Sequence, residues 1–170
     1  MKIKGLAHVA FNVASIERSL DFYCGKLGMR QVFSMTYADL LQMLWSMAEQ
    51  APQEGENKSM LEQMAQQLLD KKDLLWMTYL EFAPGQFIEL FATESGALFK
   101  DRDPQKVGYQ HFALEVEDIQ EARASLIAAG VPILRDASLG PDHTWQLWLT
   151  DPDGNEFELH QYTPASLQYL

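Results

Sequence analysis

The sequence is poor in cysteine, in positive charge and in long apolar runs. Its single cysteine, Cys24, excludes an internal disulfide, which agrees with a reducing compartment. No apolar run approaches the roughly 18 to 20 residues that a membrane-spanning helix needs, and the start MKIKGLAHVAF has no long apolar core of the kind found in secretory leaders. We therefore expect a cytoplasmic protein with no membrane partner.

Positive charge is scarce, with 13 lysine and arginine residues against 24 aspartate and glutamate residues and a formal net charge of -11 at pH 7. A field of this sign repels the phosphate backbone, so we expect no nucleic-acid partner. The hydrophobic content of 47% over 170 residues is sufficient for a packed core. We expect the partner to be a small-molecule substrate.

The chain carries an internal duplication. The segment GLAHVAFNVASI at 5–16 returns as GYQHFALEVEDI at 108–119, which aligns His8 with His111. Self-similarity of this kind indicates two copies of one supersecondary unit.

The end of each copy is duplicated as well. WMTYLEFAPGQFIEL at 76–90 returns as WQLWLTDPDGNEFEL at 145–159, which aligns Glu89 with Glu158. Each copy therefore has a histidine near its start and a glutamate near its end, a pattern typical of metal ligands.

Both copies predict the same order of elements. In the first copy, alternating apolar residues predict a strand over 3–13, and Ser15 is the expected N-cap of a helix that ends at Gly28. In the second copy a strand again precedes a helix, which Asp118 opens and Gly130 ends. Two or three strands follow each helix, and a tight turn joins the last pair. The sequence thus predicts an α+β fold of two tandem βαβββ modules, 1–100 and 101–170.

The first module contains an insert. His8 and Glu89 are 81 positions apart, whereas His111 and Glu158 are 47 positions apart, so the first module has 34 extra residues. This insert, at about 37–76, is predicted to form two helices, the second opened by Ser59.

Methionines are concentrated in or beside the insert. They are Met35, Met43, Met47, Met60, Met64 and Met77. One interpretation is that they pack the insert onto the sheet, and the other is that they form an adaptable apolar lid over a binding cavity.

Four residues are the candidate metal ligands: His8, Glu89, His111 and Glu158. A single strand histidine or glutamate is usually structural, but the repetition at aligned positions favours a shared function. Each carboxylate lies on a mostly apolar strand, where it requires a compensating partner. Two imidazoles and two carboxylates suit a divalent ion, with Zn or Ni favoured and Fe, Mn or Co as alternatives.

Further residues are predicted to line a substrate cavity, because side chains alternate along a strand and these share a face with a ligand or lie beside one. His160 is two residues beyond Glu158 and could act as a supporting or acid–base group. The predicted cavity residues are Asn12, Phe87, Phe91, Tyr109 and His160.

Three motifs resemble the vicinal oxygen chelate (glyoxalase, bleomycin resistance and extradiol dioxygenase) superfamily: H-x-A-x-x-V at 8–13, SLDFYCGKLGM at 19–29 and DPDGNEFEL at 151–159. The resemblance covers nearly the whole chain except the insert. It implies paired βαβββ modules that form a curved mixed sheet around a cleft with a metal, frequently in a dimer. Exposed sheet edges also favour a homodimer.

The ligand set resembles that of glyoxalase I, because branches that use only two histidines and one glutamate lack a ligand at the position of Glu89. The resemblance implies a lyase or isomerase that acts through a metal-stabilised enediolate on a small carbonyl or hemithioacetal-type substrate. Glu158 or Glu89 would be the catalytic base. Whether one chain or two supply each set of four ligands stays open.

The sequence departs from glyoxalase I where that enzyme commonly holds glutathione: the corresponding positions are Asn12, Thr93 and Val107, with Lys106 adjacent to the last. We therefore expect a less charged or different substrate. The alternative functions are an Fe(II)-dependent extradiol-type dioxygenase and a non-catalytic binding protein for an antibiotic-like small molecule.

Overall fold

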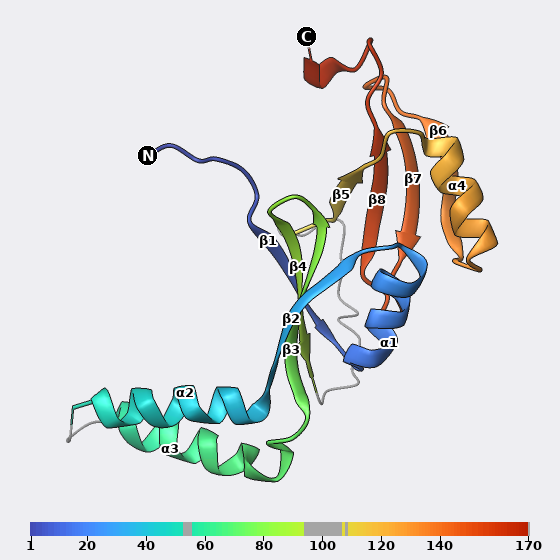
Figure 1. The fold of residues 1–170 in the computed structure, drawn as a ribbon. Coiled ribbons are helices and arrows are strands. Elements are labelled where there is room, and N and C mark those ends of the chain that lie inside the picture. The colour runs from blue at the N-terminus through green and yellow to red at the C-terminus, as the bar shows by residue number, and fades with distance from the viewer. Residues whose placement is uncertain (53–55, 94–106, 108, 170) are drawn as a thin grey trace. The chain divides into compact units, whose positions relative to one another are not determined.

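A computed structural model describes residues 1–52, 56–93, 107 and 109–169 (Figure 1). The elements of the first copy are β1 (His8–Val13), α1 (Ile16–Leu20), the π-helical turn η1 (Asp21–Lys26), β2 (Arg30–Thr36), α2 (Tyr37–Gln50), α3 (Glu56–Leu68), the 3-10 turn η2 (Leu69–Lys71), β3 (Leu75–Ala83) and β4 (Gln86–Ala92). Those of the second copy are β5 (Phe112–Glu115), α4 (Ile119–Ala128), β6 (Ile133–Leu139), β7 (Trp145–Thr150), β8 (Glu156–Gln161) and the 3-10 turn η3 (Leu167–Tyr169).

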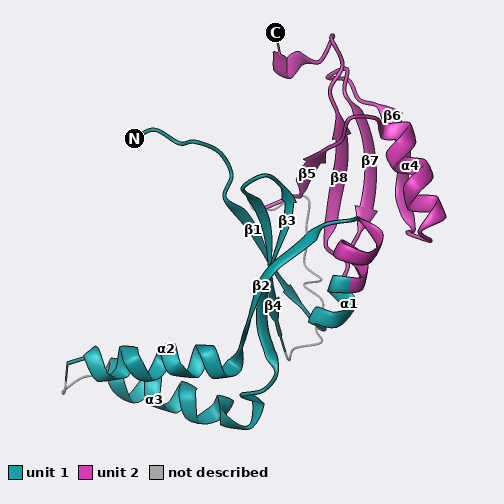
Figure 2. Ribbon diagram, in the orientation of Figure 1, with its two compact units in different colours: residues 1–20, 28–94 teal, residues 21–27, 95–170 magenta. Residues whose placement is uncertain are grey.

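The chain divides into two compact units (Figure 2). Unit 1 contains residues 1–20 and 28–94, and unit 2 contains residues 21–27 and 95–170. The predicted module boundary at residues 100 and 101 lies outside the described residues. No helix among the described residues is both long and apolar enough to cross a membrane.

Each unit contains one four-stranded mixed sheet. The strand order is β1-β4-β3-β2 in unit 1 and β5-β8-β7-β6 in unit 2. Strand β1 runs parallel to β4, and β5 runs parallel to β8. The other pairings are antiparallel. This topology confirms the predicted α+β fold of two tandem βαβββ modules.

The strand register is also the same in both copies. Ala10 pairs with Glu89 in the first sheet, and Ala113 pairs with Glu158 in the second. Because side chains alternate along a strand, this shared register puts the candidate histidine and glutamate of each copy on one face of its sheet.

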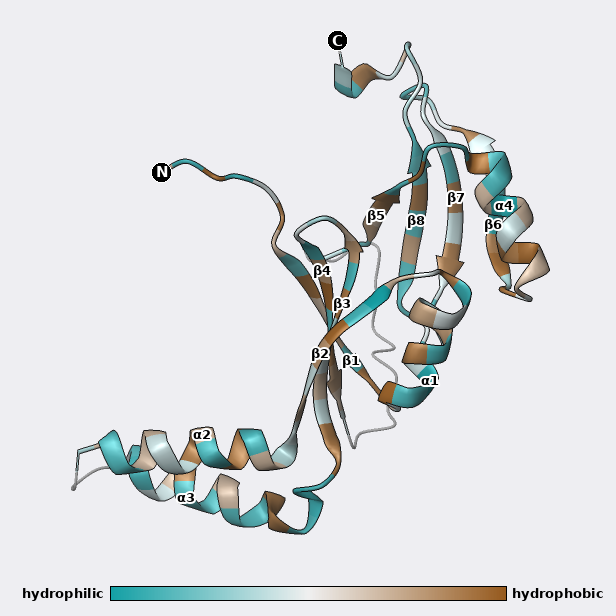
Figure 3. Ribbon diagram, viewed as in Figure 1, coloured by the Kyte–Doolittle hydropathy of each residue, from teal (hydrophilic) through white to brown (hydrophobic). Residues whose placement is uncertain are grey.

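The opposite face of each sheet is the packed one. In unit 1 the residues Val13, Leu80, Ile88 and Leu90 are fully buried. Along β1 exposed and buried residues alternate, with Phe11 and Val13 buried on the packed face. Figure 3 shows apolar and polar residues along the strands of both sheets.

A tight turn precedes the last strand of each copy, as predicted, and each turn contains a glycine. Gly85 joins β3 to β4 with a φ of 72°, and Gly154 lies between β7 and β8 with a φ of 81°. Only glycine adopts this left-handed region at no steric cost, so both turns depend on it.

The predicted strand over 3–13 is too long. β1 begins at His8 and residues 1–7 are exposed. The parallel partner β4 begins at Gln86, and Phe87 pairs with His8, so within the described part of the chain residues before Ala7 have no facing strand to pair with.

The two inserted helices form a hairpin that extends from the end of β2 and β3 (Figure 1). Thr36 caps α2 in a reciprocal capping box with Asp39. The second predicted start is wrong: α3 begins at Glu56, so Ser59 lies inside the helix and does not cap it.

The hairpin has a small core of its own, formed by Leu41, Leu44 and Ala65, with Leu40, Leu61 and Leu68 packed against it.

The expectation that the methionines pack the insert onto the sheet is wrong for four of them: Met43, Met47, Met60 and Met64 are exposed. Leucine and alanine fill the helix contact, which leaves these methionines on outer faces. Only Met77, on β3, is buried among the predicted set.

Residues 21–27 continue the helix that begins at Ile16 but pack in unit 2. The rings of Phe22 and Tyr23 contact Phe157, and the Tyr23 hydroxyl donates a hydrogen bond of 3.0 Å to Asp151 Oδ2. Burial, together with the charge of Asp151 and this hydrogen bond, raises the pKa of Tyr23 well above its ordinary value.

Candidate metal centre

The first half of the candidate centre lies on β1, β4 and β3 of unit 1. His8 Nε2 is 3.5 Å from Glu89 Oε2. The next strand places Tyr79 directly beside Glu89, and the Tyr79 ring packs against the His8 ring with the centroids 5.8 Å apart. Burial, then the polar interaction with Glu89 and its negative charge, raise the pKa of Tyr79.

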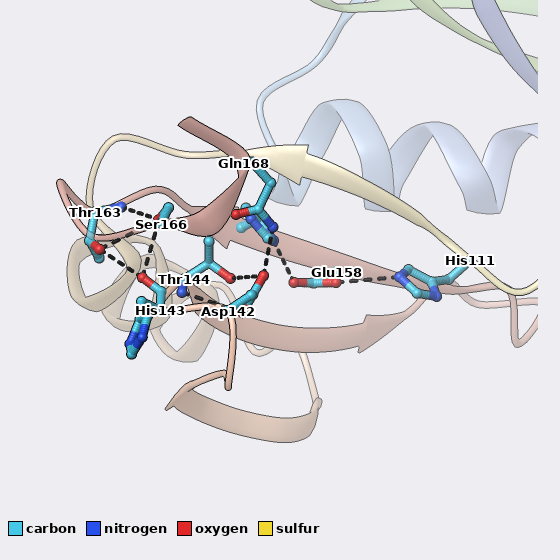
Figure 4. A network of polar contacts seen from close by, with 9 residues as sticks. His111, Asp142, His143, Thr144, Glu158, Thr163, Ser166 and Gln168 are labelled. Carbon is cyan, nitrogen blue, oxygen red and sulfur yellow. Dashed lines mark hydrogen bonds and ion pairs between the residues drawn. The ribbon is translucent and has the colours of Figure 1, made fainter. Parts of the chain in front are cut away.

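The second half has the same arrangement in unit 2 (Figure 4). His111 Nε2 is 3.4 Å from Glu158 Oε2. The other carboxylate oxygen, Oε1, is 2.7 Å from His160 Nδ1. Trp148, which pairs with Glu158 across the sheet, packs its ring edge against His111 with the ring centroids 4.5 Å apart.

The separation between histidine Nε2 and glutamate Oε2 in each pair suits two ligands of one metal ion. Distances of 3.4 and 3.5 Å exceed the about 2.7 to 3.2 Å of a good N–H···O hydrogen bond. Two ligands held at about 2.1 Å from one metal lie about 3.0 Å apart at a right angle and about 3.4 Å apart at the tetrahedral angle. The donor atoms of each pair are therefore spaced like two ligands of one ion.

Each described unit holds two of the four predicted ligands. Glu89 is 9% exposed and Glu158 is 4% exposed, whereas both histidines are exposed. Within the described residues, no three histidine, cysteine, aspartate or glutamate side chains are grouped so that they could hold a metal ion. A four-ligand centre thus requires both pairs.

The surroundings of the two pairs differ. In unit 1 the ring of Phe33 stacks on Tyr79 with centroids 4.8 Å apart. In unit 2 the guanidinium of Arg135 lies 3.9 Å from the centre of the Trp148 ring. Both halves therefore have an aromatic flank, and the second half has a cation beside it as well.

The structure places three predicted cavity residues next to the ligands. Phe87 and Phe91 lie on the Glu89 face of β4, and His160 contacts Glu158 directly. Asn12 lies on the His8 face of β1 and is exposed, and Tyr109 precedes β5 and is 58% exposed.

The structure also describes the positions that correspond to those at which glyoxalase I commonly holds glutathione. Thr93 directly follows β4, and its N–H donates to the Val13 carbonyl; Val107 is fully exposed. Lys106 lies outside the described residues.

Four flanking residues were not predicted from the sequence: Tyr79, Trp148, Phe33 and Arg135. The alignment of 76–90 with 145–159 does pair Tyr79 with Trp148. Their placement beside the glutamates depends on the β3–β4 and β7–β8 registers, which the alignment alone does not specify.

A second polar network in unit 2 ties the C-terminal segment to the β6–β7 turn (Figure 4). Thr163 and Ser166 hydroxyls donate to the His143 carbonyl at 2.7 and 3.1 Å. Hydrogen bonds from Gln168 and Thr144 lower the pKa of Asp142 to about 2. His143 is exposed and has a φ of 62°.

The family model of the Glyoxalase/Bleomycin resistance protein/Dioxygenase superfamily matches residues 5–159. The chain belongs to this superfamily. The match includes all four candidate ligands, His8, Glu89, His111 and Glu158, and both βαβββ modules.

Solved structures show that this superfamily member shares its fold with several others. A glyoxalase family protein from Enterococcus faecalis is 22% identical with a TM-score of 0.63, covering 94% of this chain and 99% of the other. Lactoylglutathione lyase from Agrobacterium tumefaciens is 14% identical with a TM-score of 0.56, covering 95% and 96%. TioX from Micromonospora sp. ML1 is also 14% identical with a TM-score of 0.56, covering 94% and 99%.

Proposed function

We propose that this superfamily member is a metal-dependent lyase or isomerase of the glyoxalase type, acting on a small carbonyl or hemithioacetal substrate. The observation that supports this most directly is the repeated histidine–glutamate pair. Each pair has the same strand register and a donor spacing of 3.4 to 3.5 Å that suits one shared ion. The centre would form when both pairs face one ion, either within one chain or between two chains of a homodimer.

The chemistry assigned to the carboxylates is proton transfer. A bound divalent ion would stabilise negative charge that develops on a substrate oxygen. Glu89 or Glu158 would remove the proton from the adjacent carbon and return it to the neighbouring one. Both carboxylates are buried, which limits competition from water at the reacting atoms.

The flank of the first pair favours a substrate with an aromatic or apolar portion. Phe33, Tyr79 and Phe87 form a continuous group of rings beside Glu89, with centroids 4.8 and 5.9 Å apart. The exposed Asn12 lacks the positive charge that a carboxylate of glutathione would require. A neutral thiol adduct therefore suits this half better than a glutathione adduct does.

The first test is metal binding. After dialysis against a chelator, the protein is titrated with Zn²⁺, Ni²⁺, Co²⁺, Mn²⁺ or Fe²⁺ by calorimetry, and we expect saturable binding that a His8→Ala, His111→Ala double variant loses. His143→Asn is a matched control, because it removes an exposed imidazole at a left-handed position that asparagine tolerates. Undiminished binding in the double variant contradicts the proposal.

The second test is catalysis. We expect metal-dependent thioester formation from methylglyoxal adducts of several thiols, with uncharged thiols preferred over glutathione. Oxygen uptake with a catechol that persists in Glu89→Gln would support the dioxygenase alternative instead. Tight binding of a small molecule that a chelator leaves unchanged would support a binding protein.

A further inference from the structure

Each ligand carboxylate has a second polar neighbour besides its histidine. Glu89 lies directly across from Tyr79 of the neighbouring strand β3, whose side chain carries a hydroxyl donor. Glu158 is bonded through Oε1 by His160 Nδ1 at 2.7 Å, and His160 lies on the same strand, β8. Both carboxylates therefore have a donor that is separate from the predicted ligand set.

The two donors occupy positions that are not equivalent in the duplication. The offset of 69 residues that relates Glu89 to Glu158 also relates Tyr79 to Trp148 and Phe91 to His160. Phe91 has no polar atom, and Trp148 packs against the His111 ring. Each half thus places one donor group next to its carboxylate, and the two donor groups come from different residues at different positions.

The His160 contact has the geometry of an orienting hydrogen bond. The side chain is 13% exposed, and Tyr162 packs edge-on against its ring with the centroids 4.7 Å apart. Since an ionised carboxylate only accepts hydrogen bonds, Nδ1 is the donor. Nε2 is buried and has no hydrogen-bond partner among the described residues, so the imidazole's polar contact is the one to Glu158.

The bond to Oε1 determines which way the other oxygen points. With Oε1 held by His160, Oε2 faces His111 at 3.4 Å, the separation that suits two ligands of one ion. A charge-assisted hydrogen bond of 2.7 Å is strong enough to limit rotation of the carboxylate. Residues that orient metal ligands in this way typically change metal affinity 10- to 100-fold when they are replaced.

We propose that Tyr79 and His160 are positioning residues of the candidate metal centre, each holding one ligand carboxylate so that an oxygen faces the histidine of its own half. This inference rests on the proposed metal-binding function. It assigns to His160 a role carried by Tyr79 in the first half, although the two residues are unrelated in sequence position.

The duplication supplies the test, because the first-half arrangement can be rebuilt in the second half. His160→Phe copies Phe91 and removes the donor, and adding Trp148→Tyr copies Tyr79 and provides a new one. Zn²⁺ affinity is measured by competition with a chromophoric chelator, and the absorption spectrum of the Co²⁺-loaded protein reports ligand geometry. Tyr162→Phe is the control, since its ring packs on His160 while its hydroxyl is not part of the Glu158 contact.

We expect His160→Phe to weaken Zn²⁺ binding about 10- to 100-fold and to alter the Co²⁺ spectrum. The double variant should recover most of the affinity, and Tyr162→Phe should match the wild type. Tyr79→Phe removes a single hydroxyl from the first half and should cause a similar loss, so the inference stays testable even if His160→Phe fails to fold.

Two results overturn the inference. The first is unchanged affinity in both His160→Phe and Tyr79→Phe, and the second is a double variant that binds no better than His160→Phe. Failure of the proposed function looks different, since the wild-type protein itself would then bind no divalent ion.

Discussion

Replacing Tyr23 with phenylalanine tests the buried bond that ties residues 21–27 to the second sheet. Tyr23 is fully buried, and its hydroxyl donates to Asp151 Oδ2 at 3.0 Å. A hydrogen bond to a charged group contributes about 1.5 to 3 kcal/mol. Asp151 would keep three other donors, from the N–H groups of Asp153 and Asn155 and the Asn155 side chain. Because the carboxylate stays paired, the loss should be near the lower limit, about 1.5 to 2 kcal/mol.

The same substitution should change how stability depends on alkaline pH. The pKa of Tyr23 is raised in the folded protein, mainly by burial and then by Asp151. Its contribution is complete below the ordinary tyrosine pKa of 10.0 and is lost as the pH rises toward the folded value. Over that window one such group lowers the free energy of unfolding by about 1.4 kcal/mol per pH unit.

Urea unfolding followed by circular dichroism, at neutral pH and at several values above 10, measures both effects. Tyr23→Phe should lower the midpoint at neutral pH without changing the m-value, and it should show a shallower decline above pH 10. The control Tyr162→Phe removes a half-buried hydroxyl and should change stability by less than about 0.5 kcal/mol. Equal midpoints and equal alkaline slopes in wild type and Tyr23→Phe would refute the reasoning.

Three further predictions follow from the site, the insert and the C-terminal network. If two chains supply each centre, mixing the His8→Ala and His111→Ala proteins should restore Zn²⁺ binding at one site in each mixed dimer, as measured by calorimetry. No recovery after subunit exchange would show that one chain supplies all four ligands. Leu44→Ala should destabilise the α2–α3 hairpin by about 2 to 4 kcal/mol, visible as faster amide exchange there, while Zn²⁺ affinity stays unchanged; reduced affinity would contradict an independent hairpin. Asp142→Asn should make the free energy of unfolding depend less steeply on pH between 4 and 2. The lowered pKa of Asp142 gives stability that is complete above pH 3.8 and is lost as the pH falls through about 2. An unchanged acid transition would contradict this.

Much of the fold was predictable because the duplication repeats its chemistry at fixed offsets. The alternation around His8 and His111 predicts strands, and the glycines that end the helices and form the turns predict where the chain reverses. The two pairs of candidate ligands followed from the alignment, and the structure brings the members of each pair within 3.5 Å. Whether they bind metal stays a prediction.

The boundaries and the flanking residues were not predictable in the same way. The start of β1 depends on where its partner β4 begins, which is a property of pairing and not of local alternation. The start of α3 before Ser59 reflects contacts with α2 that override the local capping signal. Tyr79 and Trp148 reach the glutamates only through strand registers that long-range pairing determines.

The β2–β3 and β6–β7 hairpins are equivalent in the duplication, but the connections at their ends differ in length and in contacts. In unit 1 the last pair of the β2–β3 ladder is Thr36 with Leu75, and residues 37–74 connect the two strands. In unit 2 the last pair of the β6–β7 ladder is Leu139 with Trp145, and residues 140–144 are enough to connect them. Leu75 is four residues along β3 from Tyr79, so the insert joins the sheet about 13 Å from the Glu89 row. The first hairpin end is therefore a place where chain length can vary without altering the ligand register, and it suits the grafting of a reporter domain. The second end, held by the C-terminal segment through the His143 carbonyl, is a place where such a graft would disturb the fold.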